Sequence, residues 1–422
     1  MKRSSSRCRS NRAPGPFADE CEKGARVIAE KSYTLTKGTV LAPDGTLQAR
    51  DLSIAGAVVA DEDQRALGSR DTIDCSGLTI LPGIIDVHGD AFEREIEPRP
   101  GVAIGHRIAL GAVDRTLIAN GITTAFHGLT ISWEPGQRSL DAGRRFLSAL
   151  DDARPKMQAD HRVQVRWETF ALNAVDDVFR WLQASPKIAL AFNDHTTSTV
   201  EKVRAGHHEK LDQWAKRSGL EPAEYVDLAH AVFQRAADVP KAIEQLAAAA
   251  RAQAIPMLSH DERRLDERRR YRVIGASICE FPLAPEVAAN AISNAEAVVL
   301  GGPNVIRGGS HTGALSAEDA IRDGLCTVLA SDYYYPSLFH AAERLVARGV
   351  LPLAEAWALV STNAAAAMGL SDRGKLAPGC RADCVLADTC GSEWRLVATI
   401  AAGRLTRLSH GPPLTTSPPL AS

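Results

Sequence analysis

Six side chains that commonly bind metal ions follow short apolar runs of the chain, at positions where strands are expected to end. They are His88, Asp90, Glu168, His195, His260 and Asp332. Imidazole nitrogens and carboxylate oxygens suit divalent ions such as Zn²⁺, Mn²⁺ and Fe²⁺. A single histidine or aspartate in such a place is usually structural or caps a helix. All six together, each at the end of an apolar run, predict a metal centre.

The spacing of the first two ligands predicts a pair on one face of a strand. Residues two apart in a strand point to the same side, so His88 and Asp90 can hold one ion together. We expect Asp332 to complete this first ion site. Asp332 would also be the general base that orients a water molecule and takes its proton. If the base lies elsewhere, Asp261 is the next candidate, because it directly follows a ligand histidine.

A second ion fits the number of ligands better than one ion alone. We expect His195 and His260 to hold it, with Glu168 bridging the two ions. Two Zn²⁺ ions are the first expectation for this donor set, with Mn²⁺ or Fe²⁺ as alternatives. Such ions lower the pKa of a water molecule, which would make that water the nucleophile of a hydrolase.

A glycine-rich segment from Asn304 to His311 is the first candidate for substrate contact. Its backbone N–H groups could surround phosphate oxygens, and Arg307 offers a forked guanidinium. Arg99, held between two prolines near the first ligands, is a second candidate for binding an anion. The sequence alone is equally consistent with substrate contact and with a plain turn that carries a surface arginine and a structural His311.

Residues 263–272 contain six arginines. The simpler interpretation is a solvated helix or loop. The alternative is a positive funnel that draws an anionic substrate toward the metal centre.

The elements that must position these side chains alternate along the middle of the chain. Apolar runs that read as strands occupy residues 84–88, 122–127, 163–168, 188–193, 256–259, 276–281, 296–300 and 327–331. Helical segments lie between them, such as 239–253 after Asp238 and a helix that begins at Ser316. Eight such units predict an α/β fold with a parallel (β/α)₈ TIM barrel, whose chemistry lies at the carboxyl ends of the strands.

The two ends of the chain have a different pattern of apolar residues and turns from the middle. Residues 31–80 and 375–409 contain short strand-like runs broken by turns, which predict several short strands at each end of the chain. The barrel would then span residues 81–374. The basic segment 1–30 and the Pro/Ser/Thr-rich segment 410–422 are expected to be disordered tails.

The composition is that of an ordinary globular protein. The 422 residues are 45% hydrophobic and 24% charged, with a formal net charge of −2. This balance argues against nucleic acid or an anionic membrane as a partner and favours a small-molecule substrate. No apolar run is long enough to span a bilayer, and the eight cysteines form no C-x-x-C pair. We therefore expect a cytoplasmic protein and leave a homo-oligomer open.

The motifs around these residues resemble those of the amidohydrolase superfamily. They are LPGIIDVHGD at 81–90, Gly-Ile-Thr-Thr at 121–124 and the tail STNAAAAMGLSDRGKLAPGCRADCVLAD at 361–388. The resemblance implies a barrel with a metal centre and a small β-sandwich domain that both terminal segments, 31–80 and 375–409, build together. His-x-Asp in place of His-x-His, and a glutamate in place of a carboxylated lysine as the bridge, narrow the resemblance.

Within the superfamily, the chain is most similar to the phosphonate-degradation branch of α-D-ribose 1-methylphosphonate 5-triphosphate diphosphatases. The shared motifs are Pro-Arg-Pro at 98–100, SHD at 259–261, GGPNVIRGGSHTG at 301–313 and SDYYYP at 331–336. This resemblance implies a phosphorylated substrate and favours substrate roles for Asn304, Arg307 and His311. The chain departs from the branch at Gly89–Ala91 and in the segment 196–201, which leaves open a relative with another substrate.

The leading hypothesis is therefore a hydrolase that cleaves a phosphoanhydride of a phosphorylated ribose-type substrate. The alternative is a hydrolase of C–N bonds, such as a deaminase or a cyclic amidase. The first needs cations around a polyanion, which Arg99 and Arg307 would supply, whereas the second needs few. A non-catalytic binding module would require missing metal ligands, and all six are present.

Overall fold

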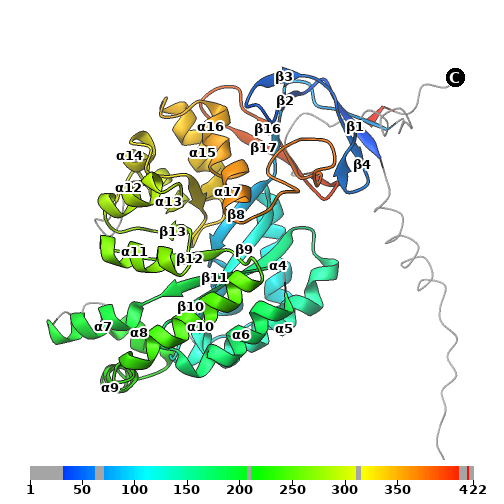
Figure 1. Cartoon of the computed structure of the whole chain (residues 1–422). Helices are drawn as coiled ribbons and strands as arrows, with labels where there is room; N and C mark the ends of the chain where they lie inside the picture. Colours follow the sequence, from blue (N-terminus) through cyan, green and yellow to red (C-terminus); the bar gives the residue numbers. More distant parts are fainter. Residues whose placement is uncertain are drawn as a thin grey trace, which may run out of the picture.

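A computed structural model describes residues 32–61, 71–99, 101–185, 187–206, 211–309, 315–407 and 416–417. Within these ranges the chain forms a barrel surrounded by helices, with a smaller pair of sheets beside it (Figure 1). The segment 1–30 and most of 410–422, predicted as tails, lie outside the described residues.

The barrel is a sheet of eight parallel strands that follow one another in chain order. The strands are β8 (Ile84–Gly89), β9 (Ile122–Ile131), β10 (Asp160–Glu168), β11 (Ile188–Asn193), β12 (Met257–His260), β13 (Ile278–Glu280), β14 (Ala297–Gly301) and β15 (Val328–Ala330). A bridge between Gly89 and Asp332 joins the last strand to the first. The predicted (β/α)₈ barrel is confirmed.

Side chains along each barrel strand alternate between the interior and the surrounding helices. On β10, Val163, Val165 and Trp167 belong to the core shared with the helices. Because residues two apart share a face, Arg166 and Glu168 point inward. The same alternation places polar side chains at the carboxyl end of this strand, inside the barrel.

Helices follow most strands and cover the outside of the barrel (Figure 1). They are α3 (Phe92–Ile96), α4 (His106–Ala119), α5 (Leu140–Ala153), α6 (Val175–Ala184), α7 (His195–Arg204), α8 (Leu211–Ser218), α9 (Pro222–Phe233), α10 (Val239–Ala252), α11 (Leu265–Val273), α12 (Pro285–Ser293), α13 (Gly302–Arg307), α14 (Ala317–Arg322), α15 (Ser337–Ala347), α16 (Leu353–Ala358) and α17 (Thr362–Ala367). The two helices named from the sequence are α10 and α14, and the Ser316 hydroxyl accepts a cap bond from the N–H of Asp319.

Both terminal segments build the two smaller sheets, as predicted. One contains β1 (Tyr33–Thr36), β4 (Leu52–Ala55), β5 (Val58–Val59), β6 (Thr72–Asp74) and β19 (Thr416–Ser417); the other contains β2 (Thr39–Leu41), β3 (Leu47–Ala49), β7 (Thr79–Pro82), β16 (Cys384–Asp388), β17 (Arg395–Ala401) and β18 (Arg404–Arg407). A common apolar core, including Leu35, Ile80 and Leu386, fills the space between them. The strand β16 pairs with β7, which ties the C-terminal segment to the N-terminal one.

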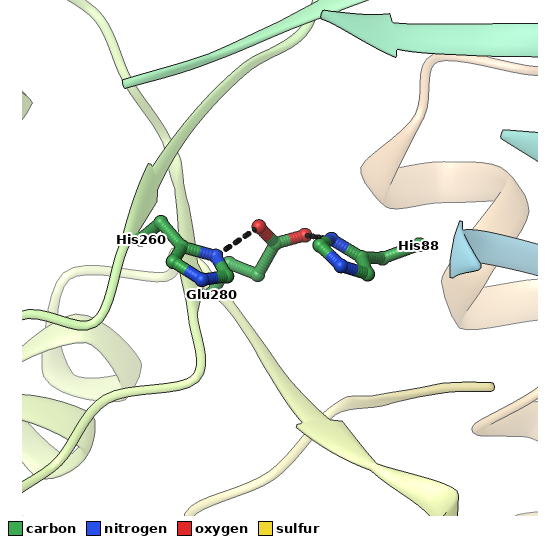
Figure 2. A group of neighbouring side chains, drawn as sticks. All are labelled: His88, His260 and Glu280. Carbon is green, nitrogen blue, oxygen red and sulfur yellow. Dashed lines mark hydrogen bonds and ion pairs between the residues drawn. The ribbon is translucent and has the colours of Figure 1, made fainter. Parts of the chain in front are cut away.

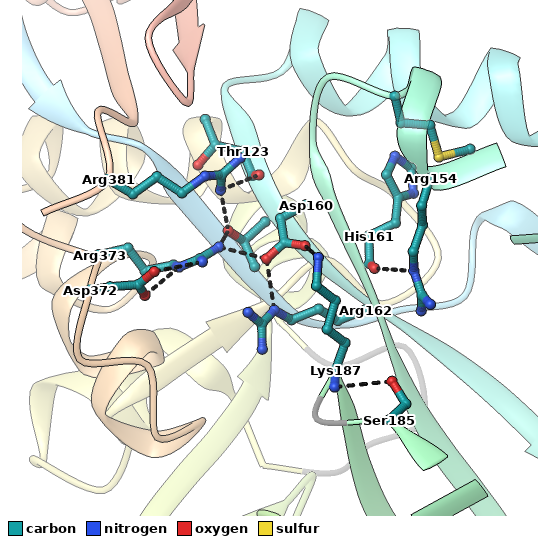
Figure 3. Close-up of polar contacts among 12 residues, drawn as sticks. Thr123, Arg154, Asp160, His161, Arg162, Ser185, Lys187, Asp372, Arg373 and Arg381 are labelled. Atoms are coloured by element: carbon teal, nitrogen blue, oxygen red, sulfur yellow. Dashed lines mark hydrogen bonds and ion pairs between the residues drawn. The ribbon is translucent and has the colours of Figure 1, made fainter. Parts of the chain in front are cut away.

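A buried ion network occupies the amino-terminal end of the barrel strands (Figure 3). Asp160, at the start of β10, contacts Lys187 at 2.7 Å, Arg162 at 2.9 Å and Arg373 at 2.8 Å. Arg373 also donates to the Thr124 hydroxyl at 2.8 Å. These contacts fasten the segment after α17 to the base of the barrel, the end that serves stability rather than chemistry.

No helix among the described residues is both long and apolar enough to cross a membrane.

Candidate metal centre

At the carboxyl end of the barrel, three groups of side chains each bring their possible ligand atoms within 4.8 Å of one another. The groups are His88, Asp90 and Asp332; His195, His260 and Asp261; and His88, His260 and Glu280. The first group is the set predicted for the first ion. The second contains both histidines predicted for the second ion, together with Asp261.

Glu280, at the end of β13, lies between two of the histidines (Figure 2). Its carboxylate is 3.0 Å from Nδ1 of His88 and 2.7 Å from Nδ1 of His260, and it accepts a bond of 2.6 Å from Gln164. An ionised carboxylate carries no hydrogen and can therefore only accept hydrogen bonds. Each of the two Nδ1 atoms must then carry the hydrogen of its bond to the carboxylate. Both imidazoles are thereby oriented, with Nε2 as the remaining ring nitrogen.

The electrostatics of this trio favour an ionised glutamate. Burial opposes a charge on Glu280, but the charge of His88 and the hydrogen bonds from both imidazoles outweigh it and hold the pKa of Glu280 well below its ordinary value. Burial likewise opposes a charge on His88, but the Glu280 carboxylate raises the pKa of His88 above its ordinary value. Carboxylates that orient ligand histidines in this way are usual behind metal ions.

Arg166 extends from β10 into the same space. Its Nη2 is 3.0 Å from Nε2 of His260, and its Nη1 is 3.7 Å from a carboxylate oxygen of Asp90. The guanidinium is buried, and its Nε has no hydrogen-bond partner among the described residues. Gly128 makes room for it, because a Cβ there would lie 3.2 Å from the Arg166 side chain and 3.3 Å from the His88 ring.

Asp332 follows β15 in a left-handed backbone conformation, with φ of 54°. Its N–H donates to the His88 carbonyl and its carbonyl accepts from the Asp90 N–H, both at 2.9 Å. Burial, and then the charge of Asp90, raise the pKa of Asp332 to about 6. Two acidic side chains held this closely beside an imidazole are a natural place for a divalent cation.

Glu168 supports the helix that carries His195. Its carboxylate accepts bonds from the N–H of His195 at 3.1 Å and from the N–H and hydroxyl of Thr196 at 3.2 and 2.8 Å. Within the described part of the chain, it belongs to none of the three ligand groups. Its carboxylate lies 3.4 Å from Nδ1 of His195, and Asp261 lies 3.6 Å from both His195 and His260. The bridging role of Glu168 therefore stays a prediction.

A cavity of about 290 Å³, here called the first cavity, opens beside the first ligand group. Asn304 and Arg307, predicted to contact the substrate, are both among its lining residues. The Asn304 amide is occupied, since it accepts from the Ala317 N–H and donates to the Leu315 carbonyl, both at 3.1 Å. Asn304 thus holds the loop, while the exposed Arg307 is open to a ligand.

Of the other two predicted substrate residues, only Arg99 is described, and it is not among the residues that line this cavity. Arg99 is exposed and forms an isolated bridge with Val102 on the segment between α3 and α4. His311 lies outside the described residues. Their roles stay predictions.

The arginine-rich segment combines both interpretations made from the sequence. Arg268 is fully buried, contacting Glu262 and Glu296 at 3.4 Å each, so α11 is not solvated on all sides. Arg263 is exposed and lines a second cavity of about 220 Å³, which also contacts His195.

Sequence reasoning missed Glu280 and Arg166, although both carried a signal. Glu280 stands near the end of the apolar run 276–281, in the same position as Glu168 in its own run. Arg166 lies two residues before Glu168, and alternation in the strand therefore places both side chains inside the barrel.

Comparisons with known proteins identify the family of this chain. Residues 183–409 match the model of the amidohydrolase family. The chain belongs to the amidohydrolase family. This amidohydrolase is 30% identical over 327 residues to the alpha-D-ribose 1-methylphosphonate 5-triphosphate diphosphatase of Escherichia coli (strain K12), a match that covers 75% of this chain and 85% of the relative.

Solved structures share the fold of this amidohydrolase. A putative prolidase from Bifidobacterium longum matches with a TM-score of 0.56 and 16% identity, over 90% of this chain and 95% of the other. A triazine hydrolase variant matches with a TM-score of 0.59 and 16% identity, over 89% and 94%. At these identities the likeness concerns the fold alone.

Amidohydrolases are generally metal-dependent, and the residues of this member fit a divalent ion. Each ligand group combines imidazole nitrogen with carboxylate oxygen, the donors that zinc and similar ions take. Burial, and then the charge of Asp90, raise the pKa of Asp332, and a bound cation would stabilise the ionised form of both carboxylates.

Proposed function

We propose that this amidohydrolase uses divalent ions to hydrolyse a phosphoanhydride in a phosphorylated ribose-type substrate. The similarity to the Escherichia coli diphosphatase carries the proposal, because this chain covers 85% of that relative at 30% identity. The candidate ligand groups support it, since they supply the donors that such a reaction requires at the carboxyl end of the barrel.

In this proposal, two ions are held at the barrel mouth. His88, Asp90 and Asp332 would hold the first. His195 and His260 would hold the second, with Glu168, as predicted from the sequence, or with Asp261, which forms a ligand group with both histidines. Two Zn²⁺ ions are the leading choice, with Mn²⁺ or Fe²⁺ as alternatives. When bound, such ions would supply positive charge that polarises the phosphoryl group.

The chain's own residues would then position the reactants. Asp332 would orient the attacking water and accept its proton, since its backbone is fixed by hydrogen bonds to His88 and Asp90. Arg166 and Arg307, which line the first cavity, would bind phosphate oxygens. Arg99 and His311 remain predicted additional contacts.

The direct experiment compares two substrate classes with the ion-loaded enzyme. We expect release of diphosphate from α-D-ribose 1-methylphosphonate 5-triphosphate and no turnover of a neutral cyclic amide. Arg307→Ala should raise KM for the triphosphate by roughly tenfold, the worth of one charge-assisted bond. Turnover of the amide without turnover of any phosphoanhydride would replace this proposal with a C–N hydrolase.

The cytoplasmic location and the domain bounds stay predictions from the sequence. Whether the protein forms a homo-oligomer stays open.

A further inference from the structure

The second cavity adjoins the candidate metal centre from the side of β9, β10 and β11. Its lining includes Glu168, His195 and Asp261, whereas the first cavity touches His88 and Asp332. Both cavities share Asp261. A substrate whose reacting bond lies at the metal centre therefore has room on two sides, one for each product.

The outer wall of the second cavity is a fixed aromatic cluster. Glu134 anchors it, accepting bonds of 2.8 and 2.7 Å from Arg217 and 2.9 Å from the Tyr225 hydroxyl. The Tyr225 ring lies 5.5 Å from that of Trp133 and 6.4 Å from that of Trp214. The aromatic surfaces are thus engaged with one another.

Another contact covers the aromatic wall from the cavity side. The Lys202 ammonium lies 5.8 Å from the Trp214 ring centre. The aromatic rings of this wall thus contact one another and one cation of the cavity lining. The remaining lining groups decide what the cavity binds.

Apart from Glu134, which anchors the cluster, and from Glu168, His195 and Asp261 at the candidate metal centre, those remaining groups are hydroxyls and cations. Thr130 is 5% exposed, and its hydroxyl has no hydrogen-bond partner within the described residues. Buried polar atoms without a partner are rare, so this hydroxyl points to a ligand. Arg263 lines the cavity as well, and its guanidinium forms no ion pair in the described part of the chain. Hydroxyl donors beside cations suit the oxygens of a phosphate group.

The segment that departs from the diphosphatase motif also contributes to this cavity. Thr196, Ser198 and Thr199 of α7 all line it, and Thr196 accepts a bond of 2.7 Å from the Trp133 indole. Because Thr196 donates in turn to Glu168, the aromatic wall and the metal centre are connected through one hydroxyl.

We propose that the second cavity is the subsite for the diphosphate leaving group, an assignment that rests on the proposed function. Water attacks the phosphorus nearest the sugar and forms a new P–O bond. The P–O bond to the bridging oxygen breaks, and its electron pair leaves with diphosphate. One proton of the water goes to Asp332, and the other stays on the sugar phosphate.

The test measures binding of inorganic diphosphate to the ion-loaded enzyme by calorimetry, without any turnover. Arg263→Ala and Thr130→Val should each weaken binding, the arginine change by roughly tenfold. Valine preserves the shape of Thr130, so the second variant tests the hydroxyl alone. Arg269→Ala is the matched control, since Arg269 is an exposed arginine of α11 outside this lining, and it should leave binding unchanged.

Equal diphosphate affinity in Arg263→Ala, Thr130→Val and the wild type would overturn the assignment. A loss seen only in Arg307→Ala would also overturn it, because it would place diphosphate in the first cavity. Turnover of the phosphoanhydride by a wild type that binds no diphosphate would reject the subsite and leave the proposed function standing.

Discussion

Glu280 accepts hydrogen bonds from two imidazoles that stack 5.6 Å apart, and it therefore sets the orientation of both. Both carboxylate oxygens of Glu280 are needed, because each imidazole donates its hydrogen bond to a different oxygen. This arrangement makes the ligand geometry depend on a residue that need not touch an ion. The effect of its loss should appear first in ion affinity.

Glu280→Gln should lower the affinity for Zn²⁺ by about 10–100-fold, the usual cost of losing an orienting partner. The amide can accept from only one imidazole and presents N–H groups to the other. Ion affinity is measured by competition with a chelator. Glu286→Gln, on the exposed first turn of α12, is the control. Unchanged affinity in Glu280→Gln would show that His88 and His260 need no orientation.

Asp332→Asn should reduce turnover by at least ~10²-fold while the protein stays folded, because a general base is lost. Asparagine tolerates the left-handed backbone that Asp332 adopts, so the fold is preserved. Steady-state kinetics and a circular dichroism spectrum check both halves of the expectation. Normal turnover would mean that the base lies elsewhere, with Asp261 the next residue to replace.

Several site residues could be predicted from the sequence, and the reason is local. His88 lies on β8 and Asp90 directly follows that strand, so the two stand two residues apart where alternation predicts a shared face. The hydrogen bonds of Glu168 to the backbone N–H groups of His195 and Thr196 could not be predicted in the same way. Such long-range partners have no signature in a single run of residues.

At the level of elements, the eight apolar runs correspond to eight barrel strands, since a strand buried on both faces must be apolar. The helices α8 and α9 had no comparable signal. Their place over the barrel depends on Glu134, which precedes its partner Arg217 by 83 residues. The burial of Arg268 could not be predicted from the sequence either, because it depends on ion pairs with glutamates from two other segments.

Asp160→Asn should lower the free energy of unfolding at pH 7 by about 3 kcal/mol, because three cations lose a buried partner. Urea unfolding measures the change. Asp152→Asn, an exposed position on α5, should have almost no effect. A similarly small change in both variants would show that the network in Figure 3 adds nothing to stability.

The difference in unfolding free energy between the wild type and Asp160→Asn should depend on pH. Burial would raise the pKa of Asp160, but Arg162, Lys187 and Arg373 outweigh it and lower the pKa below the ordinary value. A lowered folded pKa stabilises the protein above the unfolded pKa of about 4 and loses that contribution as the pH falls. The stability difference between wild type and Asp160→Asn should therefore shrink below pH 4. A constant difference down to pH 2 would contradict this origin.

At the scale of the whole molecule, strands from both chain ends share one sandwich, and β16 beside β7 joins them directly to the barrel. The barrel architecture followed from periodicity, but the pairing between distant ends came from the family resemblance. Ion binding at the opposite end of the barrel should stabilise this single folded unit, since the ligands come from separate strands.

Zn²⁺ at a free concentration one hundred times its Kd should raise the free energy of unfolding by about 2.7 kcal/mol, because the ion binds only the folded state. Urea unfolding with and without Zn²⁺ measures the increase. The His88→Ala variant should show a smaller increase, since it lacks one ligand of the first group. The same increase in both proteins would place the stabilising ion outside this centre.

The central claim is that ions held by this barrel mouth serve the hydrolysis of a phosphoanhydride. The most direct measurement is the release of diphosphate from α-D-ribose 1-methylphosphonate 5-triphosphate by chelator-treated enzyme, before and after Zn²⁺ or Mn²⁺ is added. We expect no release without the ion, restored release with it, and release reduced at least ~10²-fold in ion-loaded Asp332→Asn. Equal release with and without the ion, or none from any phosphoanhydride by the loaded enzyme, would contradict the account.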